Sequence, residues 1–498
     1  MKRNHGSAYA NGAAPGSTGR LVVVSNRLPV VVARDGDGWR FEPGSGGLVT
    51  ALEPVLESRG GLWIGWPGIS PEALEEVRPH LADFAADHRF HLEPVPLTES
   101  EHELYYAGFA NEVLWPLFHD LQTRCTFVPD YWEAFQAVNR RFGEVVAAAR
   151  QPGDLIWVHD YQLIGVGETV RDLAPEARLG FFLHIPFPPP DIFAKLPWRR
   201  EILRGLLAYD LVGFQTSRDR RNFAACLRAF LPEAPVRGRG RGQHVLYAGR
   251  RVRIAYVPIG IDAESFASLA RTEAVAARAV QLRADLGVEH VALGVDRLDY
   301  TKGVPFKLEA VRRLLSERPE YRQRFTLVQL LVPSREEVPG YLQQKEEVER
   351  QVGEINGAFA EPGWVPIQYL FRSVPREELA ALYRAADVCL ATSLKDGMNL
   401  VAKEYCACQV DRRGVLVLSE FAGAAVQLER GALLINPYDI VGLAERIHEA
   451  CRMPVEEQQL RMARLQRNVA TEHVYRWVDD FLAALPAPSS GGEGPAAD

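Results

Sequence analysis

Short, unbroken hydrophobic runs recur along the chain, and longer stretches with apolar residues at helical spacing separate them. A run without alternating polar residues predicts a strand that is buried on both faces of a sheet. Such runs occupy residues 21–25, 155–158, 179–183, 211–214, 291–295, 325–331 and 415–418. Helices are predicted at residues 48–57, 131–149, 305–315, 335–355 and 440–450. Because strand and helix alternate almost throughout, the pattern predicts an α/β fold with parallel sheets.

One segment, residues 232–257, interrupts this alternation and divides the chain. It is rich in arginine and glycine and predicts a flexible loop followed by a hairpin. We therefore expect two doubly wound, Rossmann-like domains, an N-terminal one at 20–262 and a C-terminal one at 263–465. The two are expected to face a central cleft, because open α/β sheets bind ligands at the carboxyl ends of their strands.

The remaining segments lie at the ends of the chain. A C-terminal helix is expected within 466–485, where Trp477 and Phe481 share one face that could pack on either domain. Residues 1–19 and 486–498 are dominated by small and polar residues, so both are expected to be disordered tails.

Composition narrows the class of protein. The 498 residues include 57 basic and 64 acidic side chains, a formal net charge of −7. Nucleic-acid and membrane partners are not expected, because such binders carry a clustered basic excess. The chain has no apolar run of membrane-spanning length, no signal-like start and six scattered cysteines. A soluble protein of the reducing cytoplasm is therefore expected.

The first candidate binding element is the glycine-rich turn at Ser45, Gly46 and Gly47, before the first predicted helix. Backbone N–H groups there could approach an anionic or sugar ligand closely, and a plain structural turn explains the motif equally well. The turn lacks the GxGxxG spacing and the acidic residue of a dinucleotide site, which disfavours an oxidoreductase.

The second candidate follows the predicted strand at 291–295, where Arg297 and Lys302 stand five positions apart. At the carboxyl end of a buried strand, these side chains can converge on one phosphate or diphosphate. A salt-bridged surface loop is the alternative, and the position between strand and helix favours anion binding.

The third candidate spans residues 396–404, after a further short strand. Asp396, Gly397 and a helix start align there, so that the N–H groups of Met398, Asn399 and Leu400 could bind phosphate oxygens. Glu404 lies about one and a half turns into that helix, where a carboxylate can accept both hydroxyls of a ribose. A helix capped near Asp396 is the structural alternative.

In the N-terminal domain, Asp160 and His184 each follow a predicted strand, which places both at the rim of the expected cleft. Aromatic residues beside Arg27 and Arg335 would suit a sugar phosphate. Metal sites are not expected. Asp35-Gly36-Asp37 is typical of a hairpin turn, and Cys406 with Cys408 lacks the second pair of ligands that a zinc site needs.

Taken together, the motifs resemble those of the trehalose-6-phosphate synthases of glycosyltransferase family 20, retaining enzymes with the two-domain GT-B fold. The resemblance covers about residues 21–482 and includes the Trp63/Trp66 segment. It is carried by VVVSNRLP (22–29), GGL (46–48), YYAGFANEVLWPLFH (105–119), WVHDYQL (157–163), FFLHIPFP (181–188), DRLDYTKG (296–303), PSR (333–335) and DGMNLVAKE (396–404).

The resemblance implies roles for individual residues. The N-terminal domain would bind the acceptor and the C-terminal domain the nucleotide sugar. Donor binding would involve Gly47, Arg297, Lys302, Asp396, Gly397, Met398, Asn399, Leu400, Val401 and Glu404. Acceptor binding would involve Arg27, Trp66, Tyr106, Trp115, Asp160 and Arg335. The catalytic group would comprise His184, Asp160, Arg297 and Lys302.

The implied reaction transfers glucose from a nucleotide sugar to glucose 6-phosphate, giving α,α-trehalose 6-phosphate. Arg297, Lys302 and helix N–H groups would stabilise the leaving diphosphate, so neither a metal nor a cofactor is expected. Asp160 and Glu404 would be binding groups, not covalent nucleophiles. UDP-glucose is the favoured donor. GDP- and ADP-glucose stay open, because relatives often carry Arg at the position of Lys395 and because residues 372–374, in the loop expected near the nucleotide base, vary in type.

Three other interpretations remain. A sister enzyme could use glycerol 3-phosphate or an aminocyclitol phosphate as acceptor, although the SNR triplet that ends at Arg27 favours glucose 6-phosphate. A non-catalytic regulatory subunit would be expected to lack donor residues that are present here. An oxidoreductase is disfavoured by the missing fingerprint. Assembly into a homo-oligomer stays open.

Overall fold

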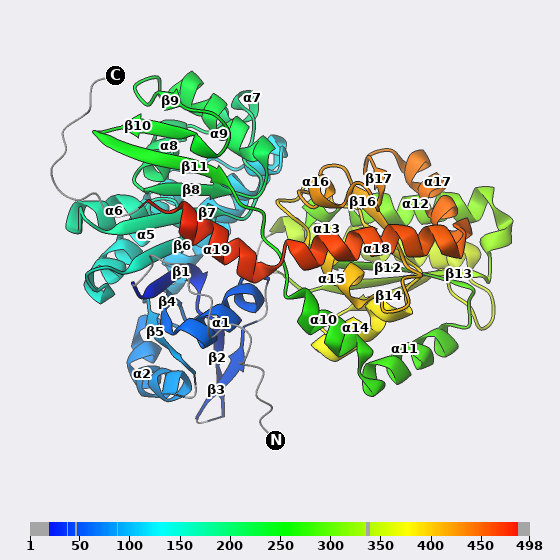
Figure 1. Cartoon of the computed structure of the whole chain (residues 1–498). Coiled ribbons are helices and arrows are strands. Elements are labelled where there is room, and N and C mark those ends of the chain that lie inside the picture. The colour runs from blue at the N-terminus through cyan, green and yellow to red at the C-terminus, as the bar shows by residue number, and fades with distance from the viewer. Residues whose placement is uncertain (1–18, 37, 45–46, 87, 335–338, 487–498) are drawn as a thin grey trace. The chain divides into compact units, whose positions relative to one another are not determined.

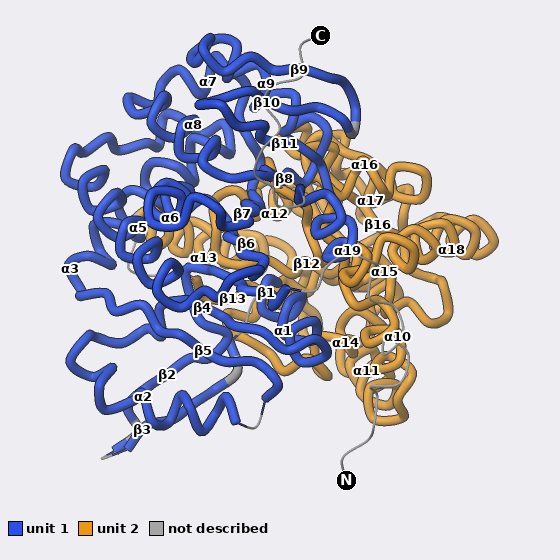
Figure 2. Tube along the Cα trace, turned by 60° about the vertical axis from the view of Figure 1, so that its left-hand side comes forward, with its two compact units in different colours: residues 1–257, 477–498 blue, residues 258–476 orange. Residues whose placement is uncertain are grey.

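The computed structural model describes residues 19–486, except for 37, 45–46, 87 and 335–338. It forms two compact units, one of residues 1–257 with 477–498 and one of residues 258–476 (Figure 2). We call them unit 1 and unit 2. The tails predicted at 1–19 and 486–498 lie outside the described residues, apart from Gly19 and Pro486.

Unit 1 contains a nine-stranded sheet in the order β5-β4-β1-β6-β7-β8-β11-β10-β9. The strands from β5 to β11 in that order are parallel, and β10 pairs antiparallel with both β11 and β9. Their bounds are β1 Leu21–Arg27, β4 Gly61–Trp66, β5 Phe90–Pro94, β6 Leu155–His159, β7 Arg178–Leu183, β8 Leu211–Phe214, β9 Val236–Arg237, β10 His244–Tyr247 and β11 Arg250–Tyr256. The unbroken apolar runs are buried as predicted, with Val22, Val23 and Val24 fully inaccessible.

Helices of unit 1 connect these strands. They are α1 Gly47–Arg59, α2 Pro71–Ala86, α3 Glu99–His102, α4 Trp115–Phe118, α5 Pro129–Ala149, α6 Val166–Leu173, α7 Pro190–Phe193, α8 Arg199–Leu207 and α9 Ser217–Phe230. Between α3 and α4 the residues Glu103–Leu114 form a π-helix, a rare geometry that is frequent at functional sites. A two-stranded antiparallel hairpin, β2 Val30–Asp35 and β3 Gly38–Pro43, turns at Gly36 and confirms the predicted turn.

The segment predicted as a loop and hairpin has a larger structural role than its composition indicates. β10 and β11 form the predicted antiparallel hairpin. β11 also pairs in parallel with β8, so the hairpin extends the main sheet of unit 1. The chain enters unit 2 directly afterwards, at Pro258.

Unit 2 contains a six-stranded sheet in the order β14-β13-β12-β15-β16-β17, parallel throughout. The strands are β12 His290–Arg297, β13 Phe325–Val332, β14 Ile367–Phe371, β15 Val388–Ala391, β16 Val415–Ser419 and β17 Leu433–Ile435. The helices are α10 Ala263–Arg271, α11 Glu273–Leu286, α12 Val304–Glu317, α13 Pro339–Phe359, α14 Arg376–Ala385, α15 Leu400–Cys408, α16 Ala425–Leu428, α17 Ile440–Arg452 and α18 Val455–Thr471.

The last helix, α19 Val474–Ala484, returns the chain to unit 1 (Figure 1). The ring of Phe481 stacks on Trp157 at 4.2 Å between centroids. Gly180 and Gly213 make room for it, because a Cβ atom at either position would approach the Phe481 ring to 2.7 or 2.8 Å. The apolar face predicted from the sequence therefore packs on the sheet of unit 1.

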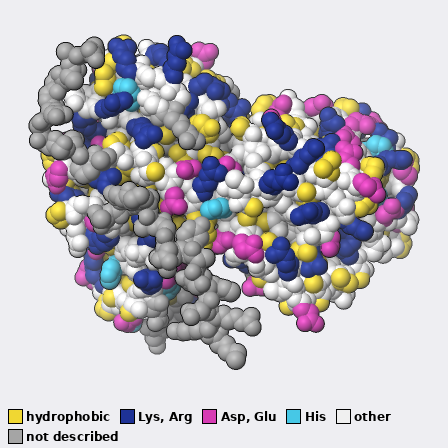
Figure 3. All heavy atoms as spheres, in the orientation of Figure 1, with side chains coloured by type: hydrophobic (Ala, Val, Ile, Leu, Met, Phe, Trp, Pro, Cys, Tyr) yellow, Lys and Arg dark blue, Asp and Glu magenta, His cyan; other side chains and the backbone are white. Residues whose placement is uncertain are grey.

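The predicted strands all fall within observed strands, and the predicted helices match α1, α5, α12, α13 and α17. Residues 335–338 of the predicted helix at 335–355 lie outside the described residues, and α13 begins at Pro339. No helix of the described chain is long and apolar enough to cross a membrane. On the face shown in Figure 3, basic and acidic side chains are interspersed.

Candidate active site

In unit 2, strand β12 ends at Arg297 and is followed by a tight turn that carries Lys302. The carboxylate of Asp299 accepts hydrogen bonds from the backbone N–H of Thr301, at 2.9 Å, and from its hydroxyl, at 2.8 Å. Gly303 ends the turn with φ of 66°, a left-handed conformation that favours glycine. These contacts fix the backbone of Lys302 at the carboxyl edge of the sheet.

Lys302 and Asp396 form an ion pair at this edge. The Nζ of Lys302 lies 2.6 Å from Oδ2 of Asp396, and the two side chains are 12% and 15% exposed. Ser393 Oγ donates to the same oxygen at 3.2 Å. The structure therefore brings together two predicted donor residues that are 94 positions apart in the sequence.

The start of α15 is capped by Asn399 and not by Asp396, which corrects the simplest structural interpretation of this motif. Asn399, at φ 82°, accepts the N–H of Ala402 on its Oδ1 at 3.0 Å. Asp396 is held by Lys302 instead, because it lies before the turn that starts the helix. The N–H groups of Leu400 and Val401 stand in the first helical turn, where a helix offers them no acceptor of its own.

The loop before α15 is anchored to the loop after β16. Gly423 N–H donates to Asp396 O at 3.1 Å, and Ala424 N–H donates to Met398 O at 2.7 Å. The loops are so close that a Cβ atom on Gly423 would lie 1.9 Å from Gly397 O. Residues 396–398 are thus held at a defined position before the helix N-terminus.

Glu404 lies further along α15, where its Oε2 accepts the hydroxyl proton of Tyr383 at 2.8 Å. Burial raises the pKa of Glu404, and the Tyr383 hydrogen bond and the charge of Arg376 oppose this shift. Tyr383 is fully buried on α14, so it fixes the direction of the carboxylate.

Lys403, the neighbour of Glu404, was not singled out by the sequence pattern. It is fully buried, and its Nζ donates to Ile259 O at 2.6 Å, in the segment where the chain enters unit 2. Burial lowers its pKa to about 7, and Glu472 opposes the shift weakly. An amphipathic pattern gives no signal for a lysine on the buried face of a helix.

In unit 1, Asp160 and His184 are joined at the ends of the adjacent strands β6 and β7. The backbone N–H of His184 donates to Oδ1 of Asp160 at 3.1 Å. Asp160 adopts φ of 74°, which is uncommon for a residue with a side chain, and its own N–H donates to Phe182 O. Burial lowers the pKa of His184 to about 3, so its imidazole is neutral at pH 7.

A stack of side chains starts at the end of β1. The guanidinium of Arg27 lies 4.4 Å from the ring centroid of Trp66. Trp66 packs on His102 at 4.2 Å, and His102 stacks on Tyr106 at 5.0 Å, between ring centroids. Burial, with the charge of Arg27, lowers the pKa of His102 to about 4. Three predicted acceptor residues thus share one stack, which His102 completes.

Fewer contacts are known for the other predicted residues. Trp115 is only 4% exposed and packs on Tyr161 and His119. Gly47 is the first residue of α1. Ser45, Gly46, Asp37 and Arg335 lie outside the described residues.

Sequence reasoning passed over His159 and His102. His159 Nδ1 lies 3.1 Å from His184 Nε2, and its side chain is buried. The available signal was positional, since His159 ends the strand next to the one that leads to His184.

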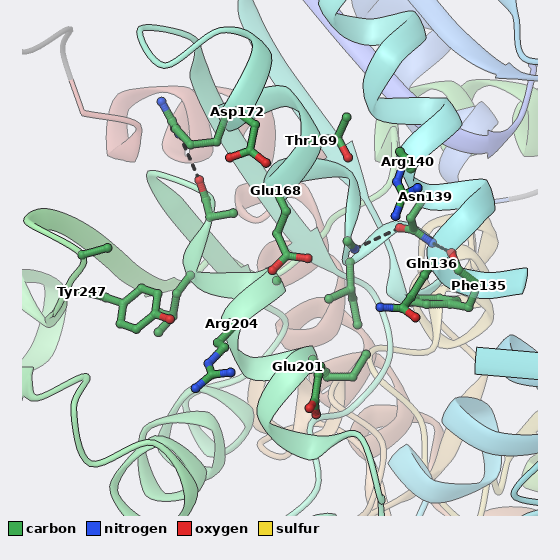
Figure 4. A pocket seen from close by; sticks show the side chains of 18 of the residues that line it. Phe135, Gln136, Asn139, Arg140, Glu168, Thr169, Asp172, Glu201, Arg204 and Tyr247 are labelled. Atoms are coloured by element: carbon green, nitrogen blue, oxygen red, sulfur yellow. Dashed lines mark hydrogen bonds between the residues drawn. The ribbon is translucent and has the colours of Figure 1, made fainter. Parts of the chain in front are cut away.

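Two further features could mark a functional site, a metal-binding group and a pocket elsewhere in unit 1. Within the described part of the chain, no three His, Cys, Asp or Glu side chains are grouped to hold a metal ion. Cys406 and Cys408 are buried, as predicted for core residues. A pocket of about 790 Å³ lies among α5, α6, α8 and the β10–β11 turn (Figure 4). None of the predicted site residues lines it.

Comparison with known proteins identifies the family. The sequence profile of glycosyltransferase family 20 matches residues 19–487. A trehalose-6-phosphate synthase of Mycolicibacterium smegmatis is 45% identical over 484 residues, 96% of this chain and 94% of the relative. One from Mycobacterium avium is 46% identical over 473 residues, 93% of this chain and 95% of the relative.

Solved structures agree with this result. An α,α-trehalose-phosphate synthase (UDP-forming) from Burkholderia xenovorans, in complex with glucose 6-phosphate, matches with a TM-score of 0.85 at 34% identity. The match covers 94% of this chain and all of that one. An Escherichia coli structure bound with UDP-2-fluoro glucose matches with a TM-score of 0.83 at 34% identity, over 94% of this chain and 98% of that one. The fold is of the GT-B type, and the chain is a glycosyltransferase that belongs to glycosyltransferase family 20.

Proposed function

We propose that the chain is a retaining glucosyltransferase that converts UDP-glucose and glucose 6-phosphate to α,α-trehalose 6-phosphate and UDP. The observation that carries this proposal is the cluster at the sheet edge of unit 2, where Lys302 contacts Asp396 next to the first turn of α15. The substrates are inferred from the relatives, since solved structures that resemble the chain are described with glucose 6-phosphate and with UDP-2-fluoro glucose.

In the proposed reaction, the bond from the anomeric carbon of the donor to its diphosphate oxygen breaks. A bond forms from that carbon to the anomeric hydroxyl oxygen of glucose 6-phosphate. The new bond forms on the face from which the diphosphate leaves, so configuration is retained, and the hydroxyl proton passes to the leaving phosphate oxygen. Arg297, Lys302 and the N–H groups at the start of α15 would stabilise the charge that grows on the diphosphate.

Donor recognition would extend along helix α15. Glu404, held by Tyr383, would accept hydrogen bonds from the ribose hydroxyls. The donor glucose and phosphates would contact Asp396, Gly397, Met398, Asn399, Leu400 and Val401 around the start of α15, together with Gly47 at the start of α1. GDP- and ADP-glucose are the alternative donors.

Unit 1 would bind the acceptor and the transferred sugar. Arg27 and Arg335 would bind the phosphate, beside Trp66, Tyr106 and Trp115. His184 and Asp160 would bind hydroxyls of the transferred glucose. Because burial lowers the pKa of His184 to about 3, it would act as a neutral hydrogen-bonding group and not as a proton carrier.

The proposal is tested by measuring nucleotide release from UDP-, GDP- and ADP-glucose, each with and without glucose 6-phosphate. We expect release from UDP-glucose only when glucose 6-phosphate is present, with a disaccharide phosphate detected by mass spectrometry. Faster release from GDP- or ADP-glucose would reassign the donor. Release that depends on glycerol 3-phosphate, and not on glucose 6-phosphate, would reassign the acceptor.

A further inference from the structure

His159 is a buried imidazole of unit 1 that has no role in the function proposed above. It ends β6 and is 1% exposed. Its ring packs on Trp157 at 4.6 Å, His184 at 5.3 Å and Trp477 at 6.1 Å, between centroids. All of these residues belong to unit 1, since α19 joins it from Trp477 onward.

The contact between the two imidazoles is a hydrogen bond that only one proton can occupy. Nδ1 of His159 lies 3.1 Å from Nε2 of His184. Burial lowers the pKa of both rings, and the proximity of His184 adds to the effect on His159, so both are neutral at pH 7. A neutral imidazole has one N–H and one bare nitrogen, and the direction of this bond therefore sets the tautomer of both rings.

The surroundings of His159 determine which of the two rings donates in this hydrogen bond. Its Nε2 is buried and has no hydrogen-bond partner among the described residues, and the same holds for the indole N–H groups of Trp157 and Trp477. A proton on His159 Nε2 would add a third unpaired donor to this aromatic cluster. A lone pair there complements the two indole donors better, so the proton belongs on Nδ1.

The direction of this hydrogen bond also sets the tautomer of His184. If His159 donates from Nδ1, His184 Nε2 is the acceptor, and the proton of His184 must be on its own Nδ1. The backbone of His184 is already held by the carboxylate of Asp160. Two consecutive residues at the end of β6 thus hold the same histidine, one through its backbone and one through its ring.

We propose that His159 is a positioning residue that fixes His184 as the Nδ1–H tautomer, so that His184 donates this proton to a hydroxyl oxygen of the transferred hexose. The second half of the statement rests on the proposed function. The tautomer itself does not, because it follows from contacts within unit 1.

The tautomer is measured directly on the full chain labelled with ¹⁵N-histidine, by NMR at pH 7 without substrate. His159→Asn and His184→Asn variants assign the two sets of signals. We expect a protonated Nδ1 and a bare Nε2 for both rings. A protonated Nε2 on His184 would overturn the proposal, whatever reaction the enzyme catalyses.

Kinetics test the effect on transfer. His159→Phe keeps an aromatic ring but cannot donate, so we expect kcat to fall roughly 10-fold, with the KM for glucose 6-phosphate little changed. His159→Asn, whose amide can replace the Nδ1–H donor, should recover most of the loss. The double variant His159→Phe/His184→Ala should be no slower than His184→Ala alone, because both act through one interaction.

Trp157→Phe is the matched control, since it removes an indole N–H from the same cluster and leaves the bond to His184; we expect nearly normal kcat. Equal losses in folded His159→Phe and His159→Asn would show a merely structural role and overturn the proposal. If His159→Phe does not fold, the NMR measurement on the unmodified chain decides the matter. Absence of transfer by the unmodified chain would refute the proposed function and leave the NMR test intact.

Discussion

The paired side chains at the sheet edges of the two units differ in charge. In unit 2, Lys302 and Asp396 form a charged pair at 2.6 Å, close to the start of a helix. In unit 1, His159 and His184 meet at 3.1 Å as buried, neutral rings, and the pKa of His184 is lowered to about 3. The contrast fits the proposed substrates, because a leaving diphosphate gains negative charge whereas the hydroxyls of a hexose stay neutral.

The comparison implies that unit 2 governs turnover through charge. Arg297→Ala should lower kcat by about 100- to 1,000-fold while the protein stays folded, since in the proposed function Arg297 stabilises the charge that develops on the leaving diphosphate. Steady-state kinetics with both substrates and a circular dichroism spectrum check this. Arg324→Ala, which removes an exposed arginine paired with Glu289 in the same unit, is the control and should have nearly normal kinetics. Near-normal turnover of Arg297→Ala would refute the donor assignment.

In unit 1, Arg27 should instead govern acceptor binding. Arg27→Ala is expected to raise the KM for glucose 6-phosphate by roughly 10- to 100-fold, the loss of one or two charge-assisted hydrogen bonds. The KM for the nucleotide sugar should change far less. Arg34→Ala is matched to it, because Arg34 also covers an indole, Trp39 at 4.6 Å, but lies in the β2–β3 hairpin. The opposite pattern of KM changes would mean that the two subsites are exchanged.

Lys403, in unit 2, provides a third test. It is a buried amine, and keeping it charged there lowers the free energy of unfolding. Its pKa is lowered from 10.5 to about 7, so the folded state binds fewer protons than the unfolded state between these values. The free energy of unfolding should therefore rise with pH above about 7, by up to about 1.4 kcal/mol per unit from this group. Urea unfolding of the unmodified chain and of Lys403→Met at pH 6 to 9 measures the difference. Identical pH dependence in both proteins would contradict the assignment.

The smallest effect is expected at Glu404. Tyr383→Phe removes the hydroxyl that donates to its carboxylate, so the KM for UDP-glucose should rise roughly 2- to 10-fold, the value of one ordinary hydrogen bond. Tyr405→Phe is the matched control on α15, because its hydroxyl donates to Asp387 O and not to Glu404. An unchanged KM in Tyr383→Phe would show that this bond does not prepare the ribose site.

Much of this architecture is predictable from sequence. Buried parallel strands have continuous apolar sequences, and functional loops follow the carboxyl ends of these strands. Arg297, Lys302, Asp160 and His184 could be named on that basis. The Lys302–Asp396 pair required the fold, since strand order brings together residues that are distant in the chain. The side on which α19 docks depends on the space above Gly180 and Gly213, which no local pattern encodes.

Local rules also failed where tertiary contacts compete with them. Asp396 precedes a helix and has the chemistry of a cap, yet Lys302 holds it and Asn399 caps the helix. His159 and Lys403 are polar residues on buried faces, where pattern analysis expects apolar side chains. Among the described residues, each contacts a single hydrogen-bonding partner, His184 for His159 and Ile259 for Lys403, that only the folded chain brings close.

In the proposed function, the enzyme joins two glucose units through their anomeric carbons with retention of configuration. NMR of the product formed from UDP-glucose and glucose 6-phosphate tests it most directly. Two α-anomeric signals and the absence of a reducing end are the predicted result. A β-anomeric signal from the transferred glucose, or a product that keeps a reducing end, would contradict the account.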